Sequence, residues 1–223
     1  WGKPLEALCV VMHIRRSDGH EICMLTEPGI IGKIGMNNAG LGVCLNILTL
    51  GCKLDGVPIH IMLRAILDCQ STREAIDVIN KAPFGKSSNI LVADRSGQCF
   101  DKEFAGDEML TPEAINGSFI HTNHYLGKEI NAASDPLFFN SRSRMKMALE
   151  RASETTDYSL DTMIDILSDR SDDKYPIYRS YLPDDVLQDV GTVATILMDL
   201  SAQQFHIRKG NQPDSPFTTF AVK

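Results

Sequence analysis

Hydrophobic and polar positions change period several times along the chain, from the alternation of strands to the three-and-four spacing of helices. Turn residues such as Ser17-Asp18-Gly19 and Asn37-Asn38-Ala39-Gly40 separate the alternating runs. The pattern predicts strands over 7–14, 21–26, 30–36, 40–47, 88–93, 98–104, 117–122, 190–200, 203–208 and 217–222. It predicts helices over 58–68, 71–81, 135–152 and 159–167.

The order of these elements indicates the fold class. Strands follow one another in runs and helices come in pairs, whereas a doubly wound parallel sheet alternates single strands with single helices. We therefore predict an α+β fold in which two antiparallel sheets pack face to face and helix pairs cover their outer faces. No repeat or linker divides the chain, so residues 1–223 are expected to form one domain.

Composition excludes several classes of function. Lys and Arg number 22 against 29 Asp and Glu, giving a net charge of −7, so the basic footprint of a nucleic-acid-binding protein is absent. No apolar run is long enough to cross a membrane, and the first residues do not resemble a signal peptide. Six cysteines without a CxxC pair predict reduced, buried thiols and a cytoplasmic location. Neither a cofactor fingerprint nor a metal-binding set is expected.

The segment 40–47 carries the first candidate site residue. Strand alternation places Gly40, Gly42, Cys44 and Asn46 on one face and aliphatic residues on the other. The small face could leave room for a substrate, with Asn46 aimed at it. It could equally accommodate another packed element, and the pattern alone leaves both open.

His121-Thr122-Asn123-His124 follows an apolar run. The two histidines would point to opposite faces and have no Cys or acidic partner nearby, so a metal site is not predicted. Asn123 at a strand exit can donate a side-chain N–H to a developing oxyanion, although an Asn there is also a common turn residue.

The third candidate is Arg179, in Tyr175-Pro176-Ile177-Tyr178-Arg179. A partly desolvated arginine can orient a carboxylate or hold the neighbours of a nucleophile, and the alternative is a surface ion pair. No catalytic motif supplies a nucleophile, and Cys44 has no electropositive neighbours in the sequence that would activate it. The chain thus offers donors and orienting groups without a nucleophile.

Several segments resemble the acyl-coenzyme A:6-aminopenicillanic acid acyltransferase family, which includes isopenicillin N acyltransferases and belongs to the N-terminal-nucleophile (Ntn) cysteine hydrolases. The resemblance runs in order over nearly the whole chain. It rests on TEPGIIGKIGMNNAGLGVCLN, GVPIHIMLRAILD, FIHTNHYL, SDPLFFNSRSRMKMALE and the closing strands.

The resemblance implies a four-layer αββα fold and an enzyme that hydrolyses or transfers the acyl group of linear, non-lactam amides such as N-acyl amides or peptides. It also implies a self-cleaving precursor, a cleaved N-terminal propeptide as a partner subunit, and an N-terminal cysteine nucleophile whose α-amine is the base. Asn123 matches the family's oxyanion-hole asparagine, Arg179 the arginine beside the nucleophile, and Asn46 an oxyanion asparagine of more distant relatives. Glu103 matches a family Glu-Phe pair without an assigned role.

In the family the cysteine precedes the region that begins here at Trp1, so the segment with the nucleophile is expected to be absent from these 223 residues. In addition, Tyr178 stands where the family has a cysteine. Two rival hypotheses remain: a catalytically inactive member that binds a small amide or acid, and a cysteine enzyme that uses Cys44.

Overall fold

The computed structural model describes residues 1–49, 55–81, 83–106, 108–127, 140–181 and 189–223. Its helices are α1 (Lys3–Glu6), α2 (Ile59–Leu67), α3 (Thr72–Ile79), α4 (Ser141–Ser153) and α5 (Leu160–Leu167). Its strands are β1 (Val10–Arg15), β2 (Glu21–Thr26), β3 (Ile34–Asn37), β4 (Leu41–Ile47), β5 (Ser88–Asp94), β6 (Cys99–Ala105), β7 (Glu108–Leu110), β8 (Ala194–Asp199), β9 (Gln204–Lys209) and β10 (Thr218–Ala221).

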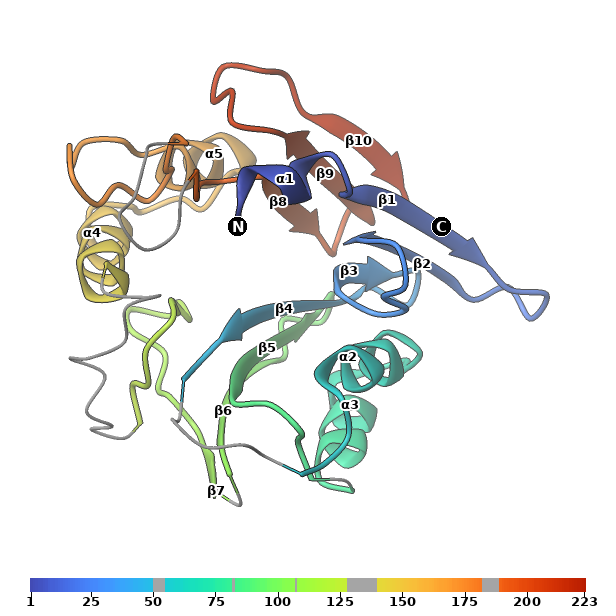
Figure 1. Cartoon of the computed structure of the whole chain (residues 1–223). Helices are drawn as coiled ribbons and strands as arrows, with labels where there is room; N and C mark the ends of the chain where they lie inside the picture. The colour runs from blue at the N-terminus through green and yellow to red at the C-terminus, as the bar shows by residue number, and fades with distance from the viewer. Residues whose placement is uncertain (50–54, 82, 107, 128–139, 182–188) are drawn as a thin grey trace.

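These strands form two antiparallel sheets. Strands β1 to β7 pair in chain order, and β8, β9 and β10 form a three-stranded sheet with β9 in the middle. Helices α2 and α3 pack on the seven-stranded sheet, while α5 packs on β8 with α4 beside it (Figure 1). The predicted four-layer arrangement of helices, two sheets and helices is therefore confirmed.

Two hydrophobic cores lie on opposite faces of the seven-stranded sheet, which explains the continuous apolar run of β2. Ile22 and Met24 face α2 and α3, whereas Cys23 and Leu25 face Phe205 and the three-stranded sheet. Successive side chains of a strand point to opposite faces, so a strand buried on both sides needs no polar positions.

Asn37, at the end of β3, is buried and fully hydrogen-bonded. Its side-chain N–H groups donate to the carbonyl oxygens of Leu67 and Cys69 after α2, at 2.9 and 2.7 Å. Its side-chain oxygen accepts from the backbone N–H groups of Ala39 and Leu41. Because each polar atom has partners, burial carries no desolvation penalty, and the β3–β4 turn is tied to the end of α2.

Three of the predicted strands begin three or four residues later than expected. The predicted strand 7–14 is Val10–Arg15, preceded by α1, the predicted strand 30–36 is Ile34–Asn37, and the predicted strand 190–200 is Ala194–Asp199. The backbone at Gly32 runs so close to α2 that a side-chain Cβ there would lie 2.4 Å from the Arg64 nitrogen. This close approach replaces strand pairing over 30–33.

The largest departures fall between β6 and α4. Residues 117–122 do not form the predicted strand, and only the isolated bridge between Ile115 and Ser118 occurs there. Strand β7 takes the place beside β6 instead, and it is absent from the predicted elements. Helix α4 begins at Ser141, and the earlier part of its predicted range, 135–139, lies outside the described residues.

The small face of β4 is filled where Gly42 stands. A Cβ on Gly42 would lie 2.8 Å from Leu200 Cδ2 and 3.4 Å from Met198 Sδ, so the second sheet occupies this space. Gly40 lies in the preceding turn with φ +81°, a conformation that favours glycine. Of the two interpretations that the sequence left open, a packed element rather than substrate room holds at Gly42, and Gly40 belongs to the turn.

We expect Gly42→Val to lower the free energy of unfolding by about 1–3 kcal/mol, because the added methyl groups overpack against Leu200. Urea unfolding of the single variant, of Leu200→Ala and of the double variant measures the effect. If the packing explanation is correct, Leu200→Ala recovers part of the loss in the Gly42→Val background. Additive losses would contradict it.

Candidate active site

The segment after residue 120 is held in place by Glu103, a fully buried residue of β6. One Glu103 oxygen accepts from His121 Nε2 at 2.7 Å and from the Leu126 backbone N–H at 2.6 Å. The other accepts from the Gly127 backbone N–H at 2.9 Å. Glu103 therefore fixes both ends of the 121–127 segment against the sheet, which gives this sequence-matched residue a physical role.

The hydrogen bonds to Glu103 also control its charge. Burial acts to raise the pKa of this carboxyl, but the His121 and backbone N–H donors outweigh burial and hold the pKa below its ordinary value. The carboxylate is thus the form that the fold stabilises.

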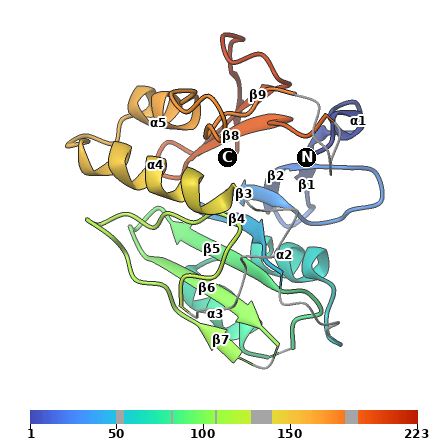
Figure 2. The ribbon, with the colours of Figure 1, turned by 60° about the vertical axis from the view of Figure 1, so that its left-hand side comes forward.

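The N-terminus of α4 docks on the same segment from the other side (Figure 2). Ser141 Oγ accepts from the Asn123 backbone N–H at 2.7 Å and contacts His124 Nδ1 at 2.8 Å. Thr122 Oγ1 donates to the Ser141 carbonyl at 3.1 Å. These bonds fix residues 122–124 to the start of α4.

The side-chain amide of Asn123 has a defined orientation. Its Nδ2 donates to the Ile47 carbonyl at the end of β4 at 3.1 Å, and its Oδ1 accepts from Arg144 Nη2 at 2.9 Å. A primary amide carries two N–H groups, and the second N–H has no acceptor among the residues that the structure describes.

Asn46 precedes the carbonyl that Asn123 contacts. It is partly buried on the inter-sheet face of β4, opposite Asn89 of β5. Among the described residues its side-chain amide forms no hydrogen bond. Asn123 therefore contacts the end of β4 at the residue that follows Asn46.

Arg179 is positioned through its backbone. Its N–H donates to Thr192 Oγ1 at 3.1 Å, and its carbonyl accepts from the Asn211 side chain at 2.7 Å. The preceding residue, Tyr178, is buried and donates its hydroxyl to the Gly210 carbonyl at 3.1 Å. A buried tyrosine thus anchors the chain just before the arginine.

The charge of Arg179 reaches the same region as Asn123. Burial, followed by the like charge of Arg179, lowers the pKa of Arg144 to about 10. Arg144 is the residue that donates to Asn123. The structure thus brings Asn46, Asn123 and Arg179 into one region through Ile47 and Arg144, and the catalytic roles of the three residues stay a prediction.

The backbone of Trp1 lies close to the Arg179 segment. The Trp1 nitrogen donates to the Gly191 carbonyl at 3.0 Å, and the Gly191 N–H donates to the Trp1 carbonyl at 2.9 Å. The next residue, Thr192, accepts from the Arg179 N–H.

A buried ion pair borders the Trp1 side of the region. Lys33 pairs with Glu27, and the Lys33 ammonium lies 4.0 Å from the centre of the Trp1 ring. Glu27 and Lys33 both belong to the TEPGIIGK segment, so this segment lies against Trp1.

The described cysteines are poorly suited to act as nucleophiles. Burial raises the pKa of the Cys44 thiol to about 11, with further contributions from Cys99 and Asp101. The pKa values of the other four described thiols are raised as well, in each case mainly by burial: Cys9, Cys23, Cys69 and Cys99. Cys52 lies outside the described residues. Since the thiolate is the nucleophilic form, this observation argues against the Cys44 hypothesis.

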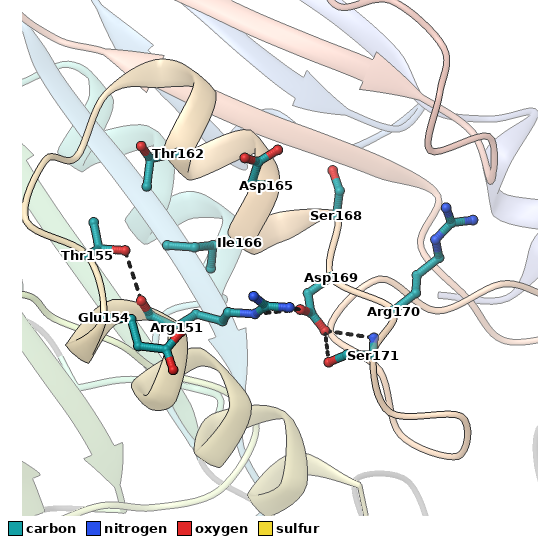
Figure 3. A pocket seen from close by; sticks show the side chains of 10 residues that line it. All are labelled: Arg151, Glu154, Thr155, Thr162, Asp165, Ile166, Ser168, Asp169, Arg170 and Ser171. Atoms are coloured by element: carbon teal, nitrogen blue, oxygen red, sulfur yellow. Dashed lines mark hydrogen bonds and ion pairs between the residues drawn. The ribbon is translucent and has the colours of Figure 1, made fainter.

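A cleft of about 640 Å³ lies elsewhere, between α4 and α5 (Figure 3). Arg151 and Asp169 form an ion pair across it, and the Asp169 carboxylate also accepts from Ser171. The Asp169 carbonyl accepts from the Tyr178 N–H at 2.9 Å. The ion pair therefore supports the segment that leads to Arg179, and the cleft contains none of the predicted site residues.

Sequence reasoning missed Arg144. The available signal was its helical position, because residue 144 comes three residues after Ser141 and shares the inward side of α4 with it. Several other basic residues of α4 carry no such contact, so the sequence pattern could not single out this one.

Two further features are absent from the described part of the chain. No helix there has the length and apolarity needed to cross a bilayer. No group of three or more His, Cys, Asp or Glu side chains within the described ranges could hold a metal ion.

The chain is similar to a known protein family and to a characterised member of it. The profile of the family "Acyl-coenzyme A:6-aminopenicillanic acid acyl-transferase" matches residues 6–214. The 40 kDa form of acyl-coenzyme A:6-aminopenicillanic-acid-acyltransferase from Emericella nidulans is 29% identical over 210 residues, covering 90% of this chain. The chain spans 56% of the length of that relative.

Two solved structures share the fold. Penicillin V acylase from Agrobacterium tumefaciens matches with a TM-score of 0.61 at 15% identity, over 85% of this chain and 66% of that one. A variant of conjugated bile acid hydrolase from Clostridium perfringens matches with a TM-score of 0.65 at 12% identity, over 96% of this chain and 84% of that one. The arrangement of sheets and helices is that of the Ntn hydrolases.

Proposed function

Since the chain belongs to the acyl-coenzyme A:6-aminopenicillanic acid acyltransferase family, we propose that the protein breaks linear, non-lactam amide bonds through a covalent acyl-enzyme. The observation that carries the proposal is the Asn123 amide, which is fixed between Ile47 and Arg144 and has one N–H without an acceptor among the described residues. Asn46 directly precedes Ile47 on β4, and the charge of Arg179 acts on Arg144.

The nucleophile in this proposal is the thiol of an N-terminal cysteine that lies outside the 223 residues and is exposed by self-cleavage of a precursor. The raised thiol pKa values of the described cysteines support a nucleophile from elsewhere. The base in this proposal is the cysteine's own α-amine, whose ordinary pKa lies close to neutrality. The cleaved propeptide would remain as a candidate partner subunit.

In the first step the thiol gives its proton to the α-amine, and sulfur attacks the amide carbonyl. The Asn123 N–H, with Asn46 as a second donor, stabilises the oxyanion that forms. The C–N bond then breaks, the proton passes to the leaving amine, and a thioester remains. Water releases the acyl group as an acid, or an acceptor amine takes it up as a new amide.

Arg179 has two roles open to it in this scheme. A guanidinium can hold the nucleophile's surroundings or bind a substrate carboxylate through paired N–H groups. Hydrolysis is the simpler outcome, because transfer requires a bound amine to react faster than water. The substrate class is a small N-acyl amide or peptide.

We expect the natural protein, expressed from its full coding sequence, to appear as two chains, the larger of which begins with cysteine. Intact mass and N-terminal sequencing measure this. Amine release from penicillin V and from a glycine-conjugated bile acid tests hydrolysis, and 6-aminopenicillanic acid with an acyl-coenzyme A tests transfer. Replacing the N-terminal cysteine should abolish turnover.

Cys44→Ser is the matched control and should retain the wild-type rate. A natural protein that begins at Trp1 and turns over none of the probes would contradict the proposal and favour an inactive binding module. Loss of activity in Cys44→Ser alone would favour the remaining hypothesis.

A further inference from the structure

Arg144 touches Asn123 more directly than any other charged side chain of α4. Its Nη2 donates to Asn123 Oδ1 at 2.9 Å, and its Nε donates to Asn140 Oδ1 at 3.2 Å. Both acceptors are neutral amides, and none of the described carboxylates forms an ion pair with Arg144. The guanidinium is therefore directed at the amide of the candidate oxyanion donor.

The two neighbours of the Asn123 amide decide which way it points. A guanidinium can only donate hydrogen bonds, and the Ile47 carbonyl can only accept them. The amide oxygen must therefore face Arg144, and the NH2 group must face the Ile47 carbonyl. With Arg144 present, flipping the amide would break the bonds to both Arg144 and Ile47. Without Arg144, the flip would break only the bond to Ile47.

The charge of Arg144 acts in the same direction. Its pKa of about 10 keeps the guanidinium protonated at neutral pH, even though burial and Arg179 disfavour the charge. A cation on the amide oxygen polarises the amide and makes its N–H a stronger donor. It also places positive charge near the position where an oxyanion would form.

Docking of α4 does not depend on Arg144. Ser141 holds Asn123, Thr122 and His124 through its hydroxyl and carbonyl groups. Since these bonds fix the helix to the segment, the contact from Arg144 is available for a task other than holding the fold together.

We propose that Arg144 is a positioning residue that sets the orientation and polarity of the Asn123 amide for oxyanion stabilisation. This inference rests on the proposed amide-cleaving function. Arg144 acts through Asn123 and does not itself have to touch the substrate.

The test uses the mature natural protein with penicillin V, or with whichever of the other probes it turns over. We expect Arg144→Met to lower kcat about 10- to 100-fold with little change in KM, because a displaced catalytic group costs rate more than binding. Arg144→Lys should recover part of the loss, since it restores a charge without the planar donor fork. The control is Arg142→Gln, because Arg142 lies two residues before Arg144 on α4 and is exposed.

A double-variant cycle separates positioning from general structure. In an Asn123→Ala background, Arg144→Met should cause almost no further loss of kcat, because its target is already gone. Equal losses in both backgrounds, an unchanged kcat, or a loss confined to KM would overturn the inference.

The side-chain amide resonances of Asn123 give a readout that is independent of turnover. Arg144→Met should shift them, whereas Arg142→Gln should not. If the wild type turns over none of the probes, the proposed function fails, and unchanged Asn123 resonances in Arg144→Met would then overturn the positioning of the amide as well.

Discussion

Replacing Asn123 with alanine is expected to lower kcat for amide cleavage about 10²- to 10³-fold, the usual cost of removing one oxyanion donor. The free N–H of Asn123 would bond the oxyanion more strongly than the neutral carbonyl, so the loss falls on the transition state. KM should change little. Steady-state kinetics on penicillin V or another productive probe measures the effect.

Further variants distinguish the donor from the contacts around it. Asn123→Asp keeps the shape and the acceptor for Arg144 but loses the N–H donor, so it should be as inactive as the alanine variant. The change in kcat of Asn46→Ala measures how much Asn46 contributes as a second oxyanion donor. Asn38→Ala, in the distant β3–β4 turn, should retain wild-type kcat. An Asn123→Ala enzyme that folds and keeps its rate would remove Asn123 from the mechanism.

Replacing Glu103 with alanine should cost about 3–5 kcal/mol of the free energy of unfolding, because removal of one partner of a buried pair leaves the other uncompensated. Three donors would lose their acceptor: His121 Nε2 and the backbone N–H groups of Leu126 and Gly127. The 121–127 segment should loosen, and activity should fall with it. Urea unfolding followed by circular dichroism measures the stability.

Glu21 offers a matched control, since it pairs with His13 at 2.8 Å on the partly exposed β1–β2 ladder. Glu21→Ala should cost no more than about 1 kcal/mol. If both variants cost the same, Glu103 does not hold the segment as the structure indicates.

The pH dependence of the Glu103 contribution has a definite sign. The folded-state pKa lies below the ordinary value of 4.5, so the stabilisation is complete above that pH. It is lost as the pH falls from 4.5 through the folded-state pKa. The stability difference between wild type and Glu103→Ala should therefore shrink in that acid range and stay constant above it.

Local sequence signals predicted most of the elements, because capping, turn chemistry and periodicity act over a few residues. Ser71 accepts from the Glu74 N–H at the start of α3, the contact that a Ser three positions before a Glu commonly makes at a helix start. Ser159 does the same for Thr162 at the start of α5. The consecutive order of strands likewise indicated antiparallel sheets, and the family resemblance indicated their stacking.

Contacts between distant residues decided what the sequence pattern left open. Leu200 packs closely against Gly42, and the side chains of His121 and Thr122 bind Glu103 and Ser141. None of these partners lies within the window that a periodic pattern can sense.

The sequence by itself determined the types of most elements, the antiparallel order and, through resemblance, the three residues Asn46, Asn123 and Arg179. Only the tertiary structure decided how they meet. Asn123 binds Ile47, which lies 76 positions away in the sequence, and its amide oxygen faces Arg144. The sequence pattern does not distinguish Arg144 from the other basic residues of α4. Hydrogen-bond direction depends on atoms brought together by packing, and a linear pattern of residue types carries no record of it.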